Sequence, residues 1–107
     1  RLASAAHRLL DAGASGVYHV CGDERLSKYE FGVRLARAFG LPEALIRRGK
    51  IRDSQLLAKR PLDMSLSNER ARQRLGTPLG DAMEFLLELR QQQARGRREE
   101  LLAAVAD

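Results

Sequence analysis

Cysteine, histidine and aromatic residues are scarce in this sequence, and the shortages exclude several kinds of protein. Cys21 is the single cysteine, so no internal disulfide can form, and a reducing compartment, with the cytoplasm as the default, is expected. Two histidines and one cysteine are too few ligands for a structural zinc site, and we expect no metal. No apolar run approaches the about 18 residues that span a bilayer, and no apolar signal-peptide core follows Arg1. We therefore expect a soluble protein without a membrane partner.

The positive charge of the chain is concentrated in one stretch. The 107 residues suffice for one small domain, and 44% hydrophobic with 31% charged residues is an ordinary globular composition. Between Arg47 and Arg60 there are six basic residues and one acid, an excess that equals the net charge of +5 of the whole chain. Such a stretch can attract a phosphate or diphosphate, or it can be a solvated loop. Charge alone leaves both interpretations open.

Apolar periodicity predicts four helices. We expect them over about residues 2–12, from the Ser27–Glu30 capping box to Phe39, over residues 68–75, and over a last segment that includes residues 82–89. Glycines follow the first three of these segments, at the position where a helix ends in a left-handed residue. Ser67 is expected to cap the third helix, and Pro78 to open the last. Residues 91–107 are expected to form a polar helical or frayed tail.

Two short runs predict strands. Val17–Cys21 is β-prone and lies between glycines, and Ile46–Arg52 is a weaker candidate with a basic face. Two short strands cannot build a sheet with both faces covered, and a lone strand leaves its backbone groups unpaired. We therefore expect a mostly helical α/β chain whose one or two strands complete a larger sheet, contributed by residues outside this chain or by another copy of it.

The chain carries no complete catalytic or cofactor-binding constellation. Gly13 and Gly16 come after a predicted helix and before a predicted strand, whereas a phosphate-binding glycine loop follows a strand and opens a helix. Neither Tyr18 nor Tyr29 is followed four residues later by lysine. We expect no catalytic, cofactor-binding or metal-binding residue here. The loop carboxylates other than Asp63 are expected to be solvated, both histidines to be packing or surface residues, and Cys21 to be a small buried apolar residue.

Several strings of the sequence resemble a known superfamily. Gly16–Gly32, Ala36–Gly40, Lys59–Asn68 and Leu75–Gly76 resemble the C-terminal part of the extended short-chain dehydrogenase/reductase superfamily. The nearest resemblance is to the dTDP-4-dehydrorhamnose reductase group of sugar-nucleotide reductases, which also contains a regulatory subunit. It covers about residues 1–90. It implies a Rossmann-like protein whose N-terminal half binds NADP or NAD and carries a Tyr-x-x-x-Lys pair, and whose smaller C-terminal lobe closes over the nucleoside diphosphate-sugar.

The resemblance also implies which residues bind the substrate. Arg60 matches the arginine of an Arg-Pro-x-Asp segment that contacts the diphosphate, and Lys59 adds positive charge beside it. Pro61 and Asp63 support that segment structurally. A guanidinium can donate to two phosphate oxygens at once, which suits this role. A structural contact of Arg60 with Asp63 or with the backbone is the alternative.

These observations lead to one main hypothesis and two alternatives. Residues 1–90 would be the substrate-binding lobe of an NAD(P)-dependent sugar-nucleotide reductase, not catalytic by itself, with the missing Rossmann half, another subunit or a second copy in a homodimer as partner. A non-catalytic regulatory or interaction protein of the same family is the first alternative. A small basic module that binds nucleic acid is the second, and 5% aromatic residues without tryptophan or a recognised reader motif argue against it.

Overall fold

The computed structural model describes residues 1–53, 55 and 57–106. Within these residues the chain forms five α-helices and two short 3₁₀ helices, and contains no strand. It divides into two compact units that alternate along the sequence. Unit 1 comprises Arg1–Arg25 and the described residues of Arg48–Asp81, and unit 2 comprises Leu26–Arg47 and the described residues from Ala82 onward. The mostly helical character expected from the sequence is confirmed.

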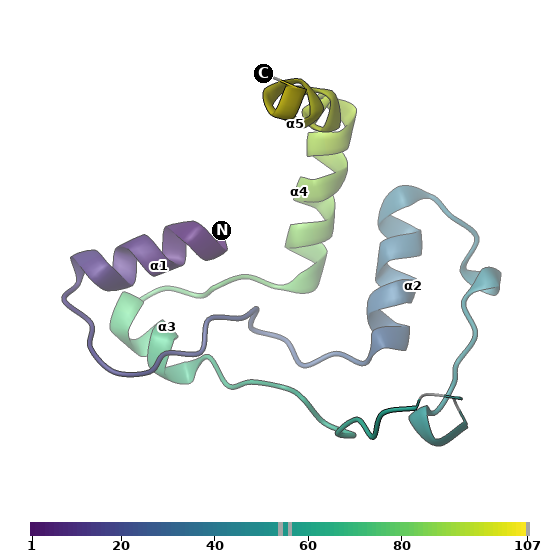
Figure 1. Ribbon diagram of the computed structural model, residues 1–107, viewed down its shortest axis with the longest axis horizontal. Coiled ribbons are helices and arrows are strands. Elements are labelled where there is room, and N and C mark those ends of the chain that lie inside the picture. Colours follow the sequence, from purple (N-terminus) through teal and green to yellow (C-terminus); the bar gives the residue numbers. More distant parts are fainter. Residues whose placement is uncertain (54, 56, 107) are drawn as a thin grey trace. The chain divides into compact units, whose positions relative to one another are not determined.

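Unit 1 is built on the contact between α1 (Leu2–Asp11) and α3 (Glu69–Leu75), which lie side by side in Figure 1. Three small or medium apolar side chains, Ala5, Leu9 and Ala71, are buried in this contact region. Both helices end as the sequence predicts, with Gly13 following α1 at φ 64° and Gly76 capping α3 at φ 66°. Glycine adopts this left-handed backbone without the steric cost that a Cβ atom brings.

Arginine side chains bind the free carbonyl groups at the ends of these two helices. Arg8 Nη2 donates to the Leu75 carbonyl oxygen at 3.3 Å, and Arg74 Nη2 donates to that of Ala12. Arg70 Nη1 donates to the Val17 carbonyl oxygen at 3.0 Å, and its guanidinium lies 4.6 Å from the centre of the Tyr18 ring. Since the last carbonyls of a helix have no partner within the helix, Arg8 and Arg74 satisfy groups that would otherwise need water, whereas Arg70 binds the loop that follows α1.

Unit 2 consists of α2 (Lys28–Phe39), the 3₁₀ helix η1 (Glu43–Leu45), α4 (Ala82–Ala94) and α5 (Arg97–Ala106). Helices α2 and α4 pack against each other, and α4 also contacts α5. The predicted capping box is present: Ser27 Oγ accepts from the Glu30 amide at 3.1 Å, and the Glu30 carboxylate accepts from the Ser27 amide at 2.8 Å. The buried residues are small or aliphatic, namely Ala36, Ala38 and Leu86.

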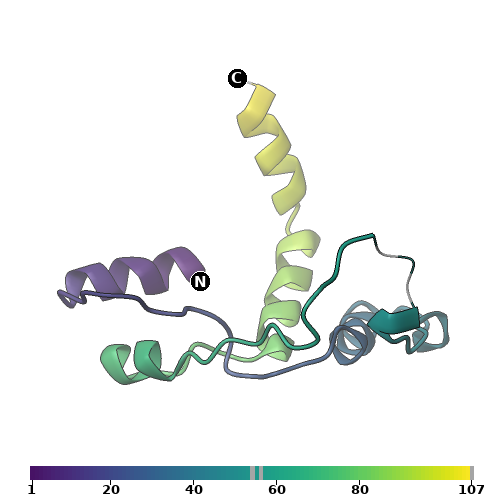
Figure 2. The same cartoon turned by 60° about the horizontal axis from the view of Figure 1, so that its bottom comes forward.

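Neither predicted strand forms among the described residues. Residues 17–21 run without regular structure, and in the second region Ile51–Asp53 forms a single 3₁₀ turn, η2 (Figure 2). The physical reason is the one that the sequence already raised, because a strand needs a neighbour for its N–H and C=O groups and the described chain supplies none. The described residues alone therefore contain no strand, and the expectation that these runs complete a larger sheet stays a prediction.

The start of α4 and the cap of α3 also differ from expectation. Helix α4 begins at Ala82, so Pro78 does not open it. The amides of residues 79 and 80 instead donate to the Asp23 carboxylate. Gly80 also has a φ of 96°, which no right-handed helix accommodates. Helix α3 has Asn68 rather than Ser67 at its N-cap, although Ser67 Oγ accepts from the Glu69 amide at 3.4 Å.

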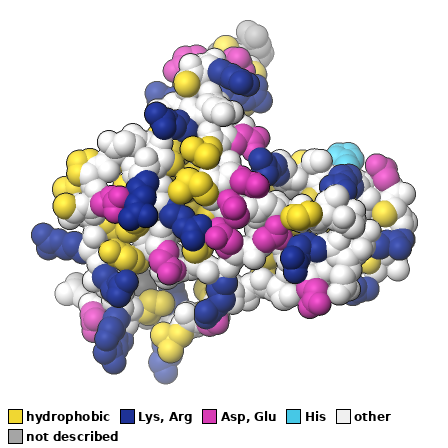
Figure 3. Space-filling view, turned by 180° about the vertical axis from the view of Figure 1, so that it is seen from behind, with side chains coloured by type: hydrophobic (Ala, Val, Ile, Leu, Met, Phe, Trp, Pro, Cys, Tyr) yellow, Lys and Arg dark blue, Asp and Glu magenta, His cyan; other side chains and the backbone are white. Residues whose placement is uncertain are grey.

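Many apolar side chains remain at the surface. Figure 3 shows them between basic and acidic side chains on the face that it draws. Leu57 and Leu62 are exposed at 107% and 88%, and both belong to the long segment between η2 and α3. No described helix is both long enough and apolar enough to cross a membrane.

Candidate functional site

The residues that the sequence assigns to the substrate lie on the long segment of unit 1 between η2 and α3. Lys59, Arg60 and Pro61 are all exposed, as is Asp63. Neither Lys59 nor Arg60 makes a hydrogen bond or ion pair with another residue that the structure describes. Their charged groups are therefore open to solvent, and a substrate role for them stays a prediction.

Asp63 holds this segment through three hydrogen bonds. Its Oδ1 accepts from the Ser65 amide at 2.9 Å and from Ser65 Oγ at 2.7 Å, which closes a local turn. Its Oδ2 accepts from Arg25 Nη2 at 2.6 Å. The alternative pairing of Asp63 with Arg60 does not occur, because Asp63 pairs with an arginine 38 residues earlier in the sequence.

These bonds also fix the charge of Asp63. The hydrogen bonds from the Ser65 hydroxyl and amide, followed by the one from Arg25, hold the pKa of the Asp63 carboxyl well below its usual range. Hydrogen bonds to a carboxylate stabilise the ionised form, so the group is negative at any pH near neutrality. Asp63 thus compensates one positive charge of its neighbourhood and leaves those of Lys59 and Arg60.

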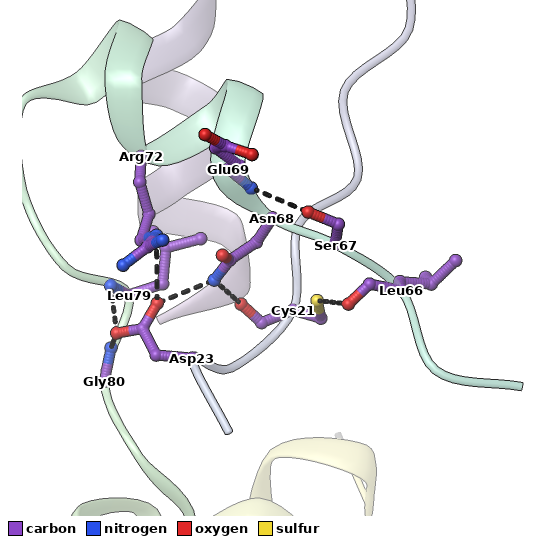
Figure 4. Close-up of polar contacts among 9 residues, drawn as sticks. All are labelled: Cys21, Asp23, Leu66, Ser67, Asn68, Glu69, Arg72, Leu79 and Gly80. Atoms are coloured by element: carbon purple, nitrogen blue, oxygen red, sulfur yellow. Dashed lines mark hydrogen bonds and ion pairs between the residues drawn. The ribbon is translucent and has the colours of Figure 1, made fainter. Parts of the chain in front are cut away.

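A second carboxylate, Asp23, links three segments of unit 1 (Figure 4). Its Oδ1 accepts from Asn68 Nδ2 at 2.6 Å, and its Oδ2 accepts from the Leu79 and Gly80 amides at 2.9 and 2.8 Å. The Asp23 amide donates in turn to the Gly80 carbonyl oxygen at 2.9 Å. Asn68 also donates to the Cys21 carbonyl oxygen at 2.9 Å. Asp23 therefore ties the loop after residue 21 to the start of α3 and to the segment before α4.

The environment of Asp23 favours its charged form. Partial burial acts to raise the pKa of the carboxyl, but the hydrogen bonds from Asn68, Gly80 and Leu79, with the charge of Arg72 at 3.8 Å, outweigh it and lower the pKa. The side chain is 19% exposed. Residue 23 as a whole is exposed, as the sequence predicts, but its carboxylate oxygens accept hydrogen bonds from three protein donors. Gly22, which follows the β-prone run of residues 17–21, is a local signal for a turn. No local signal indicates that Asp23 bonds to residues 45 to 57 positions away.

The cysteine and the two histidines all lie in unit 1. Cys21 is half-buried rather than buried, and its Sγ lies 3.5 Å from the Leu66 carbonyl oxygen, to which it donates. His7 and His19 are exposed, one on α1 and one in the segment before Cys21. Among the described residues, no three His, Cys, Asp or Glu side chains gather in a way that could hold a metal ion.

An arginine side chain lies against the glycine turn after α1. An added Cβ atom at Gly16 would lie 3.2 Å from Arg70 Nη2, so the guanidinium already fills the space next to this backbone. The same guanidinium donates to the Ser15 and Val17 carbonyl oxygens. A phosphate cradle needs free amides at a helix start, whereas this turn follows the end of α1.

Comparisons with known proteins give partial matches. The chain is 40% identical over 60 residues to methionine adenosyltransferase 2 subunit beta of Pongo abelii, a match that covers 55% of this chain and 17% of that protein. The protein of the same name from Bos taurus is 38% identical over 64 residues, covering 59% of this chain and 19% of the relative. The chain thus spans less than a fifth of the length of these relatives. No protein-family profile matches it. No solved structure matches it either.

The comparisons bear on the resemblance seen in the sequence. Both relatives are named as a subunit, and the group that the motifs resemble contains a subunit of this kind, so a second, independent observation supports the similarity to extended short-chain dehydrogenase/reductase proteins. The narrower likeness to dTDP-4-dehydrorhamnose reductases stays a prediction.

Proposed function

We propose that the protein carrying this chain is a regulatory subunit of the extended short-chain dehydrogenase/reductase superfamily that assembles with a catalytic partner. The observation that carries the proposal is the 38–40% identity to proteins named as the β subunit of methionine adenosyltransferase 2. It favours the regulatory alternative over the reductase hypothesis. The partner by the same argument is a methionine adenosyltransferase catalytic subunit.

The surface of unit 1 offers residues suited to such an assembly. Leu62, Met64 and Leu66 are exposed at 88%, 74% and 57%. Asp63 and Ser65, which alternate with them, are bonded to Arg25. The polar side chains thus hold the segment to its own unit, and the apolar side chains remain available to a partner. Apolar residues with a polar surround are typical of the core of a protein interface.

Size-exclusion chromatography of the full-length protein with the methionine adenosyltransferase catalytic subunit of the same organism tests the proposal. We expect co-elution as one complex at micromolar concentrations, and loss of the complex with Met64→Asp. The matched control is Leu45→Asp, which introduces the same charge at a leucine exposed at 78% in unit 2 and should leave the complex intact. Separate elution of the two wild-type proteins would contradict the proposal.

A second candidate function is binding of a nucleoside diphosphate-sugar. The specific observation in its favour is that Lys59 and Arg60 carry unpaired charges, as far as the described residues go, on a segment that Asp63 anchors. Two adjacent cations can donate to the two phosphates of a diphosphate. NADP or NAD would bind to a portion of the longer protein outside these residues, and the reaction expected there is reduction of a 4-keto group on a dTDP-sugar.

Isothermal titration of the full-length protein with dTDP separates the two candidates. Saturable binding that Arg60→Ala weakens at least about tenfold supports the diphosphate site. Oxidation of NADPH in the presence of a dTDP-4-keto sugar would support the reductase over the regulatory subunit. Absence of dTDP binding would contradict the second candidate and leave the first untouched.

A further inference from the structure

Arg25 connects two parts of unit 1 that are distant in the sequence. Its Nη2 donates to Asp63 Oδ2 at 2.6 Å and its Nε donates to Ser65 Oγ at 3.3 Å, so one guanidinium bonds two residues of the substrate-assigned segment. Both partners also bond to each other, since Asp63 Oδ1 accepts from the amide and hydroxyl of Ser65. The three side chains form a closed set of hydrogen bonds.

This set of hydrogen bonds lies close in sequence to the exposed cation Arg60. Asp63 comes three residues after Arg60, and Pro61 between them has a fixed φ, so little backbone freedom separates the anchored residue from the free cation. The Asp63–Ser65 turn is local and would persist without Arg25. What Arg25 adds is the attachment of that turn to the loop of residues 21–25, which Asp23 holds to the rest of unit 1.

We propose that Arg25 is a positioning residue for an anion-binding segment formed by Lys59 and Arg60. It fixes where these two cations stand relative to unit 1 by holding Asp63 and Ser65, and its role is to position them rather than to bind the anion. The ligand class is a diphosphate, free or as part of a nucleotide. The inference rests on the second candidate function above and adds to it a residue for which neither the motifs nor the relatives give a role.

The experiment is a double-mutant cycle in the full-length protein, with dTDP and inorganic diphosphate as probes in isothermal titration. The variants are Arg25→Gln, Asp63→Asn and the double variant. Asp63→Asn keeps an oxygen that can accept from the Ser65 amide and removes the charge that binds Arg25. We expect each single variant to weaken binding about fivefold, and the double variant to bind no more weakly than the worse single one.

A matched control separates positioning from a general loss of positive charge. Arg97→Gln removes an arginine from another surface ion pair, with Glu100 at 2.8 Å, in unit 2. We expect it to change dTDP affinity less than about twofold. Thermal unfolding of each variant checks that the protein remains folded at the titration temperature. Arg25→Lys keeps the positive charge but cannot donate from a planar guanidinium to both partners, so its dTDP affinity should lie between those of Arg25→Gln and the wild type.

The outcomes distinguish the possible failures. If the wild-type protein binds neither probe, the second candidate function fails and the positioning role fails with it. If dTDP binds, Arg60→Ala weakens it and Arg25→Gln does not, only the positioning proposal is overturned. If Arg25→Gln weakens binding while Asp63→Asn strengthens it, Arg25 contacts the anion directly, which also contradicts the proposal.

Discussion

The carboxylate of Asp23 should contribute measurably to the stability of unit 1, and Asp23→Ala removes it. The side chain accepts three hydrogen bonds, from Asn68 Nδ2 and from the Leu79 and Gly80 amides. Hydrogen bonds to a charged group contribute about 1.5–3 kcal/mol each. Because Leu79 and Gly80 are half-buried, their amides can bond to water in the variant, so we expect a net loss of about 2 kcal/mol.

Hydrogen exchange with mass spectrometry on the full-length protein measures this loss where it occurs. Peptides that cover residues 76–82 should exchange about thirtyfold faster in Asp23→Ala, the factor that corresponds to about 2 kcal/mol. Asp53→Ala is the control, since the contact described for that exposed carboxylate is a 3.8 Å one with Arg52, and the effect should stay below about 0.5 kcal/mol. Unchanged protection at residues 79 and 80 in Asp23→Ala would refute the reasoning.

Three further predictions concern stability. The pKa values of Asp23 and Asp63 are lowered in the folded state, so the stability that the two carboxylates add is present above about pH 4. This stability is lost as the pH falls toward the folded pKa values. The free energy of urea unfolding should therefore decrease from pH 7 to pH 3, and it should decrease less in Asp23→Asn. Ser27→Ala removes one side of the capping box and should destabilise α2 by about 1 kcal/mol, measured by exchange at residues 28–31. Gly16→Ala should cost about 1–3 kcal/mol in urea unfolding, because φ is 90° and Arg70 lies 3.2 Å from the new Cβ, whereas an unchanged midpoint would show that this turn relaxes freely.

The local signals of the sequence were sufficient for the helix ends. The capping box at Ser27 and Glu30, and glycines such as Gly40 and Gly76, act within a few residues, and the structure confirms each of them. Apolar periodicity predicted the helix α2 but not which of its side chains are buried. Phe31 is 44% exposed and the buried positions are Ala36 and Ala38, because the packing partner, α4, comes more than 40 residues later and selects the face that is covered.

The strands and the links across unit 1 could not be predicted from local signals. The run at residues 17–21 has the composition of a buried strand, yet Val17 is 71% exposed and the described chain offers it no neighbouring strand. Pro78 has the pattern of a helix start, but the amides that follow it bond to Asp23 rather than continue into a helix. The conformations of both segments depend on contacts with residues far away in the sequence. Local sequence patterns contain no information about such contacts.

The loop of residues 21–25 therefore combines two tasks that variants can separate. Asp23 bonds to residues that begin or precede helices, so its loss should lower stability wherever unit 1 is measured. Arg25 is 72% exposed, and its partners among the described residues lie on the segment assigned to the anion, so its loss should change affinity more than stability. If Arg25→Gln lowered the dTDP affinity without a matching loss of stability, Arg25 would act in binding rather than in folding. If both variants lowered affinity in proportion to their loss of stability, Arg25 would be a structural residue only.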